Sequence, residues 1–149
     1  MSNNDVAVRA MTSLDLGPAR RLLAQLGYDI APDELDHRFA AVRDAGDGHA
    51  LLVAEFSGEI VGLVHIFDRP ALEKPTEALV QSLVIDETRR GNGIGRTLMK
   101  HAEAWAKARG FTSVALHTQL KRMDARAFYG ALGYHEVGEA ALLRKKLDN

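Results

Sequence analysis

The sequence predicts a single α/β domain of the α+β kind, in which four helices flank a mixed, mostly antiparallel sheet of six to seven strands. The chain has 149 residues, enough for one hydrophobic core, because a domain of about 150 residues buries roughly 70% of the surface that its unfolded chain exposes. Strand-like segments are joined both by short turns and by helical segments, so hairpins and crossovers share one sheet. No internal repeat or linker interrupts residues 1–149, which we expect to form one domain.

The first half of the chain is expected to hold a strand, two helices and a β-hairpin. Ser13 or Asp15 can cap the first helix, and Pro32 fits the first turn of the second. The hairpin is predicted by Ser57-Gly58, which separates two apolar, β-rich segments. The apolar stripe of the first helix comprises Leu16, Ala19, Leu23 and Leu26. The expected elements are a strand over 6–10, helices over 16–26 and 33–44, and strands over 51–56 and 59–67.

The second half of the chain holds the most regular helix and the remaining strands. Over residues 93–109, apolar side chains recur at helical spacing, and Gly110 ends the pattern. Asp124 can cap a short helix that Gly133 stops. The expected elements are helices over 93–109 and 124–132, and strands over 79–85, 114–118, 135–138 and 142–147.

Composition excludes several classes of protein. The absence of cysteine excludes a disulfide framework, a thiolate zinc site and a cysteine nucleophile. No apolar run approaches the roughly 20 residues of a membrane span, and the first ten residues lack the layout of a signal peptide. We therefore expect a cytoplasmic protein with no membrane partner. The net charge of −1 argues against a bulk nucleic-acid binder.

Charge is distributed unevenly along the chain. Residues 1–75 carry 7 basic and 12 acidic side chains, whereas residues 76–149 carry 12 basic and 8 acidic ones. A positive half suits an anionic ligand and a negative half suits a cationic one, although two differently solvated surfaces would give the same count. A phosphate-binding motif in the second half would favour the interpretation that its positive charge serves an anionic ligand.

A glycine-rich loop in the second half fits that requirement. Three glycines alternate between an apolar strand and the first turn of a helix, where unpaired N–H groups and the helix dipole attract phosphate oxygens. Glycine lets the backbone approach the anion, and nearby arginines add positive charge. The alternative is a tight turn without a ligand. The loop comprises Arg89, Arg90, Gly91, Asn92, Gly93, Ile94, Gly95 and Arg96.

Two common nucleotide motifs do not fit this loop. A P-loop needs Lys followed by Ser or Thr after its last glycine, but Arg96-Thr97 follows Gly95. A dinucleotide-binding loop needs a glycine at the position of Arg96 and an acidic residue about 20 positions further on, where residues 115–117 offer none. The loop therefore indicates a different phosphate-containing ligand.

Two segments resemble motifs of one known family. Arg90-x-x-Gly93-x-Gly95, placed after a strand, is similar to the acetyl-CoA-binding motif Q/R-x-x-G-x-G/A of the GCN5-related N-acetyltransferases, the GNAT family. Residues 125–134 resemble the family's A-x-x-F-Y-x-x-x-G-F/Y motif. The order of elements agrees too, so the resemblance covers essentially the whole chain and implies the GNAT fold with acetyl-CoA as co-substrate.

One part of the chain is similar to a particular branch of the family. Residues 121–125 resemble a bacterial branch that includes the aminoalkylphosphonate N-acetyltransferases. The similarity is partial, since Arg126 stands where that branch usually has histidine and Ser82 where it often has glutamate. Arg122 also replaces an asparagine that many family members carry. The branch therefore says little about the substrate.

The resemblance implies a cofactor site made mainly of backbone. In the family, the strand before the glycine loop splays from its neighbour at a β-bulge, and the pantetheine arm fills the gap. Carried over, backbone groups of Leu83 and Ile85 would bind pantetheine, and the N–H of Val84 or Ile85 would polarise the thioester carbonyl. Amides from Gly91 through Arg96 would hold the pyrophosphate. Fixed dipoles of this kind need no reorganisation when charge develops.

Tyr129 is the side chain that the resemblance marks for catalysis. It is turned about 100° from Phe128 on the predicted helix, towards the face of Ala125. The family's equivalent tyrosine protonates the departing thiolate of coenzyme A, and a phenol with a pKa of about 10 is protonated at neutral pH. The alternative is an amphipathic tyrosine packed at the surface.

The proton acceptor for the attacking amine is not assigned by sequence. Many family members use a strand glutamate through water, but residues 79–85 contain no carboxylate. Glu77, just before that strand, is the candidate catalytic carboxylate, and His65 and His117 are the other candidates. Either histidine could instead be a satisfied strand residue. The histidines lack zinc-site spacing, so no metal is indicated.

The expected activity is acetyl transfer from acetyl-CoA to a primary amine of a small molecule by direct attack, with no covalent enzyme intermediate. An acidic segment that spans the loop between the first two helices and the start of the second would suit a cationic amine, although a helix N-terminus also favours acidic residues. The alternatives are a peptide or protein N-acetyltransferase and a non-catalytic acyl-CoA-binding sensor. Family members are often dimers, which implies a homodimer. The acidic segment includes Tyr28, Asp29, Asp33, Glu34 and Asp36.

Overall fold

The computed structural model describes residues 5–148, and its contacts divide the chain into two units. The first unit ends at His117 and the second begins at Thr118. The single domain expected from the sequence stays a prediction. The first unit holds the sheet and helices up to α3, while the second holds α4 and the C-terminal segment.

The elements follow the predicted order up to the fourth helix. Among residues 5–148, no helix is both long enough and apolar enough to cross a membrane. The elements are β1 (Ala7–Ala10), η2 (Ser13–Asp15), α1 (Leu16–Gln25), α2 (Pro32–Asp44), β2 (His49–Phe56), β3 (Glu59–Arg69), β4 (Glu77–Ile85), η3 (Glu87–Arg89), α3 (Ile94–Ala108), β5 (Val114–Leu116) and α4 (Met123–Ala131).

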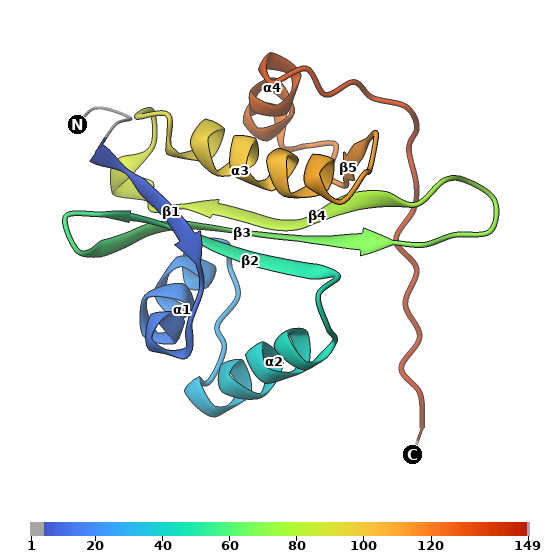
Figure 1. The fold of residues 1–149 in the computed structure, drawn as a ribbon. Coiled ribbons are helices and arrows are strands. Elements are labelled where there is room, and N and C mark those ends of the chain that lie inside the picture. The colour runs from blue at the N-terminus through green and yellow to red at the C-terminus, as the bar shows by residue number, and fades with distance from the viewer. Residues whose placement is uncertain (1–4, 149) are drawn as a thin grey trace. The chain divides into compact units, whose positions relative to one another are not determined.

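The sheet confirms the mixed α/β fold class. Its strand order is β1-β2-β3-β4-β5, with antiparallel pairs from β1 to β4 and a parallel pair between β4 and β5. Helix α3 supplies the crossover between the two parallel strands. In the first unit, α1 and α2 lie on one face of the sheet and α3 lies on the other (Figure 1).

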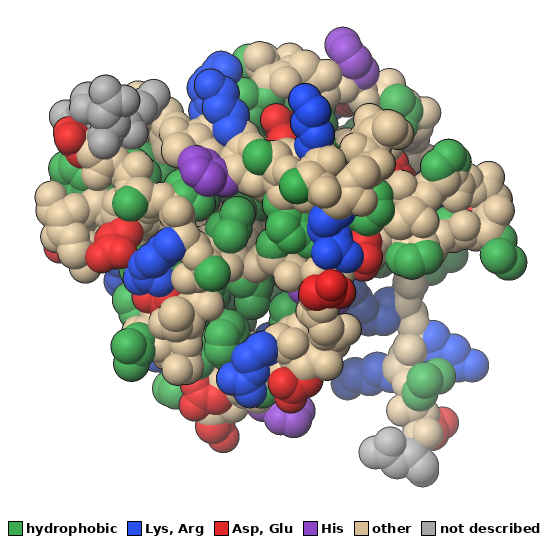
Figure 2. Space-filling view, in the orientation of Figure 1, with side chains coloured by type: hydrophobic (Ala, Val, Ile, Leu, Met, Phe, Trp, Pro, Cys, Tyr) green, Lys and Arg blue, Asp and Glu red, His purple; other side chains and the backbone are tan. Residues whose placement is uncertain are grey.

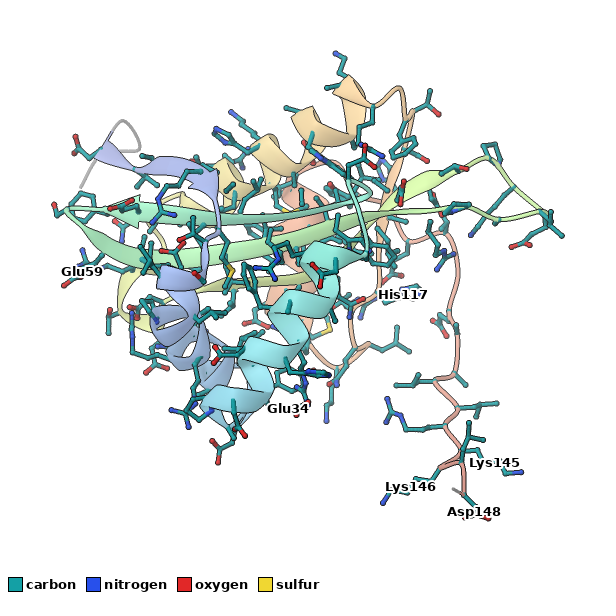
Figure 3. The ribbon with its side chains drawn as sticks, turned by 60° about the horizontal axis from the view of Figure 1, so that its bottom comes forward. Glu34, Glu59, His117, Lys145, Lys146 and Asp148 are labelled. Atoms are coloured by element: carbon teal, nitrogen blue, oxygen red, sulfur yellow. The ribbon has the colours of Figure 1, made fainter. Side chains whose placement is uncertain are left out.

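The sheet has five strands among the described residues, so the expectation of six to seven was wrong. Residues 135–138 and 142–147 form no strand, and Val137 and Leu142 are exposed. Alternating side chains indicate which face of a strand would be buried, but a strand also needs a neighbour for its backbone hydrogen bonds. Figure 3 shows Lys145, Lys146 and Asp148 extending from a single backbone trace.

Local chemistry explains two of the turns. Asp15 is the N-cap residue of α1, as predicted, but its side chain makes no capping bond to that helix. It belongs instead to a capping box around η2, where Thr12 is the N-cap and Asp15 accepts from the Thr12 N–H at 2.8 Å. In the predicted hairpin, Ser57 and Gly58 have φ of 51° and 79°. Positive φ at both central residues gives the twist that suits a two-residue hairpin.

The α1 face of the sheet is closed by a compact apolar cluster. Leu22 is fully buried there, whereas Leu23 of the predicted stripe is only partly buried. Leu22 follows the buried Ala19 by three positions, so both side chains lie on the face of α1 that meets the sheet. The cluster consists of Ala19, Leu22, Val53, Ile60, Leu63 and Val84.

Truncating this cluster should destabilise the first unit. Leu22→Ala should lower the free energy of unfolding by about 2–5 kcal/mol, because it removes buried methyl groups and leaves a cavity under the sheet. Leu14→Ala is the matched control, since Leu14 is 89% exposed. Urea unfolding followed by circular dichroism measures both variants. Equal, small effects would contradict the described core.

Candidate functional site

A β-bulge interrupts the pairing of β4 with β3. His65 pairs with Ser82 and Ile66 pairs with Val80, so Gln81 is an extra residue in β4. Such an insertion bends the strand and shifts its alternation by one position. Within residues 5–148, β5 pairs with β4 only from Ala78 to Val80, on one side of this bulge.

The bulge leaves backbone groups on the other side of β4 facing outward. The Asp86 N–H donates to the Val61 carbonyl at 2.9 Å, so alternation directs the backbone of Val84 towards β3 and that of Leu83 and Ile85 away from it. Among the described residues, no strand pairs with that edge beyond Val80. Of the two residues expected to polarise a thioester, Ile85 therefore presents its N–H on this open edge.

Asp86 fixes the turn that follows the open edge. It is 7% exposed, and it accepts hydrogen bonds from the Thr88 amide at 3.1 Å and from the Arg21 Nη1 at 3.0 Å. Burial by itself would raise the pKa of this carboxyl, but the Thr88 and Arg21 donors outweigh burial and lower the pKa to about 2. Gln25 Oε1 also accepts from the Glu87 N–H at 2.9 Å, so α1 holds the start of the loop.

The glycine loop delivers unpaired backbone amides at the start of α3. Gly91 and Gly93 have φ of 82° and 78°, in the left-handed region that favours glycine. Gly93 is the N-cap of α3 and supplies no side chain, while the first intrahelical bond runs from the Thr97 N–H to the Gly93 carbonyl. The N–H groups of Ile94, Gly95 and Arg96 precede that bond and are therefore available to an anion.

The polar side chains of the loop make different contacts. Asn92 donates from its side-chain amide to the Arg89 carbonyl at 2.9 Å, which closes the loop on itself. Arg89 pairs with Glu59 at 3.1 Å, and Figure 3 shows Glu59 at the hairpin end of the sheet. Arg90 and Arg96 are exposed and have no acidic partner among residues 5–148. Two of the three arginines can therefore meet an anion.

Glu77 lies at the far end of β4 from this loop. Glu77 lies six positions before Leu83, which is about 20 Å of extended strand. Glu77 pairs with Lys74 at 3.3 Å and accepts from the Ser113 hydroxyl at 3.2 Å. These contacts hold the Glu77 side chain at the start of β4, away from Leu83 and Ile85.

The two strand histidines lie in different surroundings. His65 is hydrogen-bonded to His49 on β2, with 3.0 Å between His65 Nε2 and His49 Nδ1. His117 follows β5 and is exposed. Of the two, His65 is the half-buried one, and it lies directly opposite Ser82 beside the bulge.

Tyr129 belongs to the second unit and lies on α4. Its ring contacts those of Phe128 and Tyr134 edge-on, at centroid distances of 5.1 and 5.8 Å. Burial raises the pKa of its phenol, with a smaller opposing effect of Arg122, so the group is protonated at neutral pH. A protonated phenol is a chemically competent proton donor.

Residues flanking α4 differ in part from expectation. The helix begins at Met123 with Arg122 as N-cap, rather than being capped by Asp124, whose carboxylate accepts from the adjacent Ala125 N–H at 3.0 Å. Arg126 bonds to Glu136 and donates to the Leu120 carbonyl at 2.9 Å. Arg126 thus joins the segments before and after α4 within the second unit.

Other charged surfaces of the first unit are largely self-paired. Glu34, labelled on α2 in Figure 3, pairs with Arg38 at 3.0 Å. An open depression of about 460 Å³ is lined by the ion pairs Arg9–Asp15 and Arg21–Asp86, and none of the predicted cofactor residues lines it. Acidic and basic side chains also lie next to one another over the face shown in Figure 2. These pairings give no separate ligand site.

Comparison with known proteins adds independent findings. The model of the acetyltransferase (GNAT) family matches residues 15–134. Aminoglycoside N(6′)-acetyltransferase type 1 of Klebsiella aerogenes is 30% identical over 112 residues, which are 73% of this chain and 74% of that protein.

Two solved structures share the fold. A transcriptional regulator from Bacillus halodurans C-125 aligns with a TM-score of 0.81 and 26% identity, over 94% of this chain and 99% of that one. An aminoglycoside N-acetyltransferase in complex with CoA gives a TM-score of 0.85 at 18% identity, over 95% of both chains. At that identity, the second likeness concerns the fold alone.

The Asp86 network should give the fold a measurable acid sensitivity. Because the pKa of Asp86 lies below its ordinary value of 3.8, its ionised form stabilises the fold above about pH 4, and this stabilisation is lost as the pH falls towards 2. Asp86→Asn should cost about 1–3 kcal/mol at pH 7, and the difference from the parent chain should shrink between pH 4 and 2. Urea unfolding across that range measures it, with the exposed Asp44→Asn as control. A difference that does not change with pH would contradict the ionised network.

Proposed function

This chain belongs to the GNAT family of acetyltransferases, and from that premise we propose that it transfers the acetyl group of acetyl-CoA to a primary amine of a small molecule. The observation that carries the proposal is the open edge of β4 at Leu83 and Ile85, which is connected by residues 86–93 to the amides at the start of α3. An extended amide-containing arm and a diphosphate need this succession of donors and acceptors.

Each part of the co-substrate has a matching set of groups. The pantetheine arm would lie along the open edge and bond to the backbone of Leu83 and Ile85, as an added strand does. The pyrophosphate would accept from amides between Gly91 and Arg96. Arg90 and Arg96 would add charge at the solvent side, whereas Val84 supports the edge from the core with its buried side chain.

The proposed reaction is a direct attack. The amine nitrogen forms a bond to the thioester carbon, and the carbonyl oxygen becomes an oxyanion that accepts the Ile85 N–H. The nitrogen then releases a proton, which reaches solvent. The carbon–sulfur bond breaks, and the Tyr129 phenol donates its proton to the leaving sulfur. The product amide and coenzyme A leave, and solvent restores the phenol proton. Glu77 has no step in this scheme, because its contacts hold it at the other end of β4.

The acceptor class rests on charge and on a relative. The Klebsiella relative is by name an aminoglycoside acetyltransferase, and aminoglycosides are small molecules with several amines. In this chain, Asp29 lies between α1 and α2, and Asp33 lies in the first turn of α2. Carboxylates at these positions would favour a cationic acceptor. The Bacillus halodurans structure, described as that of a transcriptional regulator, favours a second candidate, a domain that binds acyl-CoA without turnover.

The glycine loop can be tested without any acceptor. Gly91→Ala should weaken coenzyme A binding by at least about tenfold, because a side chain disfavours the left-handed backbone that presents the amides. Gly46→Ala is the matched control: its φ is 105°, and both positions have open space where a Cβ would stand. Both variants should lose similar stability, and calorimetry should show weaker binding only for Gly91→Ala. Equal affinity in both variants would place the ligand elsewhere.

The role of Tyr129 is tested by kinetics. Tyr129→Phe should lower kcat by about 10²-fold or more, because it removes the proton donor and keeps the ring. Tyr134→Phe, the matched control in the same ring cluster, should keep kcat near that of the parent. Thiol release from acetyl-CoA measures both with aminoglycoside, polyamine, aminoalkylphosphonate and peptide acceptors. Unchanged kcat in Tyr129→Phe would exclude Tyr129 as the donor.

The same acceptor panel separates the candidate functions. Turnover with small amines supports the proposed enzyme, and turnover confined to peptides indicates an acetyltransferase of peptides or proteins. Binding of coenzyme A without thiol release from any acceptor would indicate the non-catalytic domain.

A further inference from the structure

Two histidines form a hydrogen-bonded pair on the face of the sheet that α1 covers. His65 on β3 and His49 on β2 approach to 3.0 Å between Nε2 and Nδ1, and their ring centroids are 5.3 Å apart. Phe67 stacks on His49 at 5.3 Å and fixes the second ring. Because the two nitrogens of an imidazole lie on opposite sides of the ring, Nδ1 of His65 faces away from His49.

This pair lies next to the proposed acetyl site. Leu63 and Val84 belong to the cluster under α1, so alternation places His65 and Ser82, each two residues away, on the same face. His65 is directly opposite Ser82, which lies between the bulge and Leu83 (Figure 1 shows β3 and β4 side by side). Neighbouring strands are about 4.8 Å apart, so Ser82 on β4 stands between His65 on β3 and a ligand on the open edge of β4.

The surroundings keep the His65 ring uncharged. Burial, and to a smaller extent the neighbouring His49, lower the pKa of His65 to about 4. At neutral pH the imidazole therefore has a lone pair ready to accept a proton. When His65 Nε2–H donates to His49 Nδ1, that lone pair is on His65 Nδ1.

We propose that His65 takes up the proton released by the attacking amine, across the Ser82 hydroxyl, and passes a proton on to His49. This step rests on the proposed function and names the proton acceptor that the sequence leaves unassigned. As the carbon–nitrogen bond forms, a nitrogen proton goes to the Ser82 oxygen while the Ser82 proton goes to His65 Nδ1. The His65 Nε2 proton moves to His49 Nδ1, and His49 Nε2 gives its proton to solvent.

A weakly basic imidazole suffices for this transfer. The nitrogen of the tetrahedral adduct carries a positive charge next to the former carbonyl carbon, and it is far more acidic than a free alkylammonium. The acceptor therefore needs to be close and neutral rather than strongly basic. His65 replaces, from the neighbouring strand, the carboxylate that β4 lacks between Leu79 and Ile85.

The test removes the basic nitrogen of His65 and keeps its hydrogen bond to His49. In His65→Gln, the side-chain amide can still donate to His49 but cannot take up a proton, so kcat should fall by about 10²-fold or more. Coenzyme A affinity should not change. His101→Gln is the control, because His101 is exposed on α3 and bonds to the Thr97 carbonyl of its own helix. In His65→Ala, added imidazole should restore turnover, which a purely structural role would not produce.

Three results would overturn this assignment. One is a kcat in His65→Gln close to that of the parent chain, with coenzyme A binding intact. Another is His65→Ala that binds coenzyme A and gains nothing from imidazole. If neither His65 variant folds, the test is made with His49→Phe, which keeps an aromatic ring against Phe67. An unchanged kcat in His49→Phe then contradicts the proton relay. Failure of the parent chain to release thiol with any amine would instead reject the proposed function itself.

Discussion

One inserted residue in β4 is the constraint on which the rest of the site depends. Without Gln81, β4 would keep a single alternation along its pairing with β3. With Gln81, the alternation shifts, and the backbone groups of Leu83 and Ile85 face an edge that no described strand occupies. A buried polar backbone group is costly unless it has a partner, so this edge is stable only beside solvent or a ligand that supplies hydrogen bonds.

The same end of β4 is held rigidly by charge from another element. Arg21 and Gln25 of α1 reach the turn after β4, where Arg21 donates to the Asp86 carboxylate and Gln25 Oε1 accepts from the Glu87 N–H. A preorganised set of donors loses little entropy when an anion arrives, and it stabilises developing charge without rearrangement. The arginines contribute less than their number suggests, since Arg89 is paired with Glu59. Backbone amides therefore carry most of the proposed recognition.

Sequence predicts the elements well and the network around them poorly. The strand, the three glycines and the amphipathic α3 are local patterns, and the structure places them as expected. The bulge at Gln81 depends on how β3 and β4 align, and the His49–His65 pair joins residues 16 positions apart, so neither has a local signature. Asp86 stands directly after an apolar strand, and an acidic residue at such a position could have predicted a side chain that fixes the following turn. The two strands expected after Tyr134 are absent from the described residues, because an alternating pattern of side chains does not form a strand without a neighbouring strand to bond its backbone.

Binding of coenzyme A by main-chain amides of β4 and of the loop into α3 can be measured by amide proton–nitrogen correlation spectra during a titration with coenzyme A. Saturable shifts are expected for the amides of Leu83, Ile85 and residues 91–96, with little change at β1 and α2. Absence of shifts at millimolar coenzyme A, or shifts confined to the depression lined by Arg9 and Asp15, would contradict it.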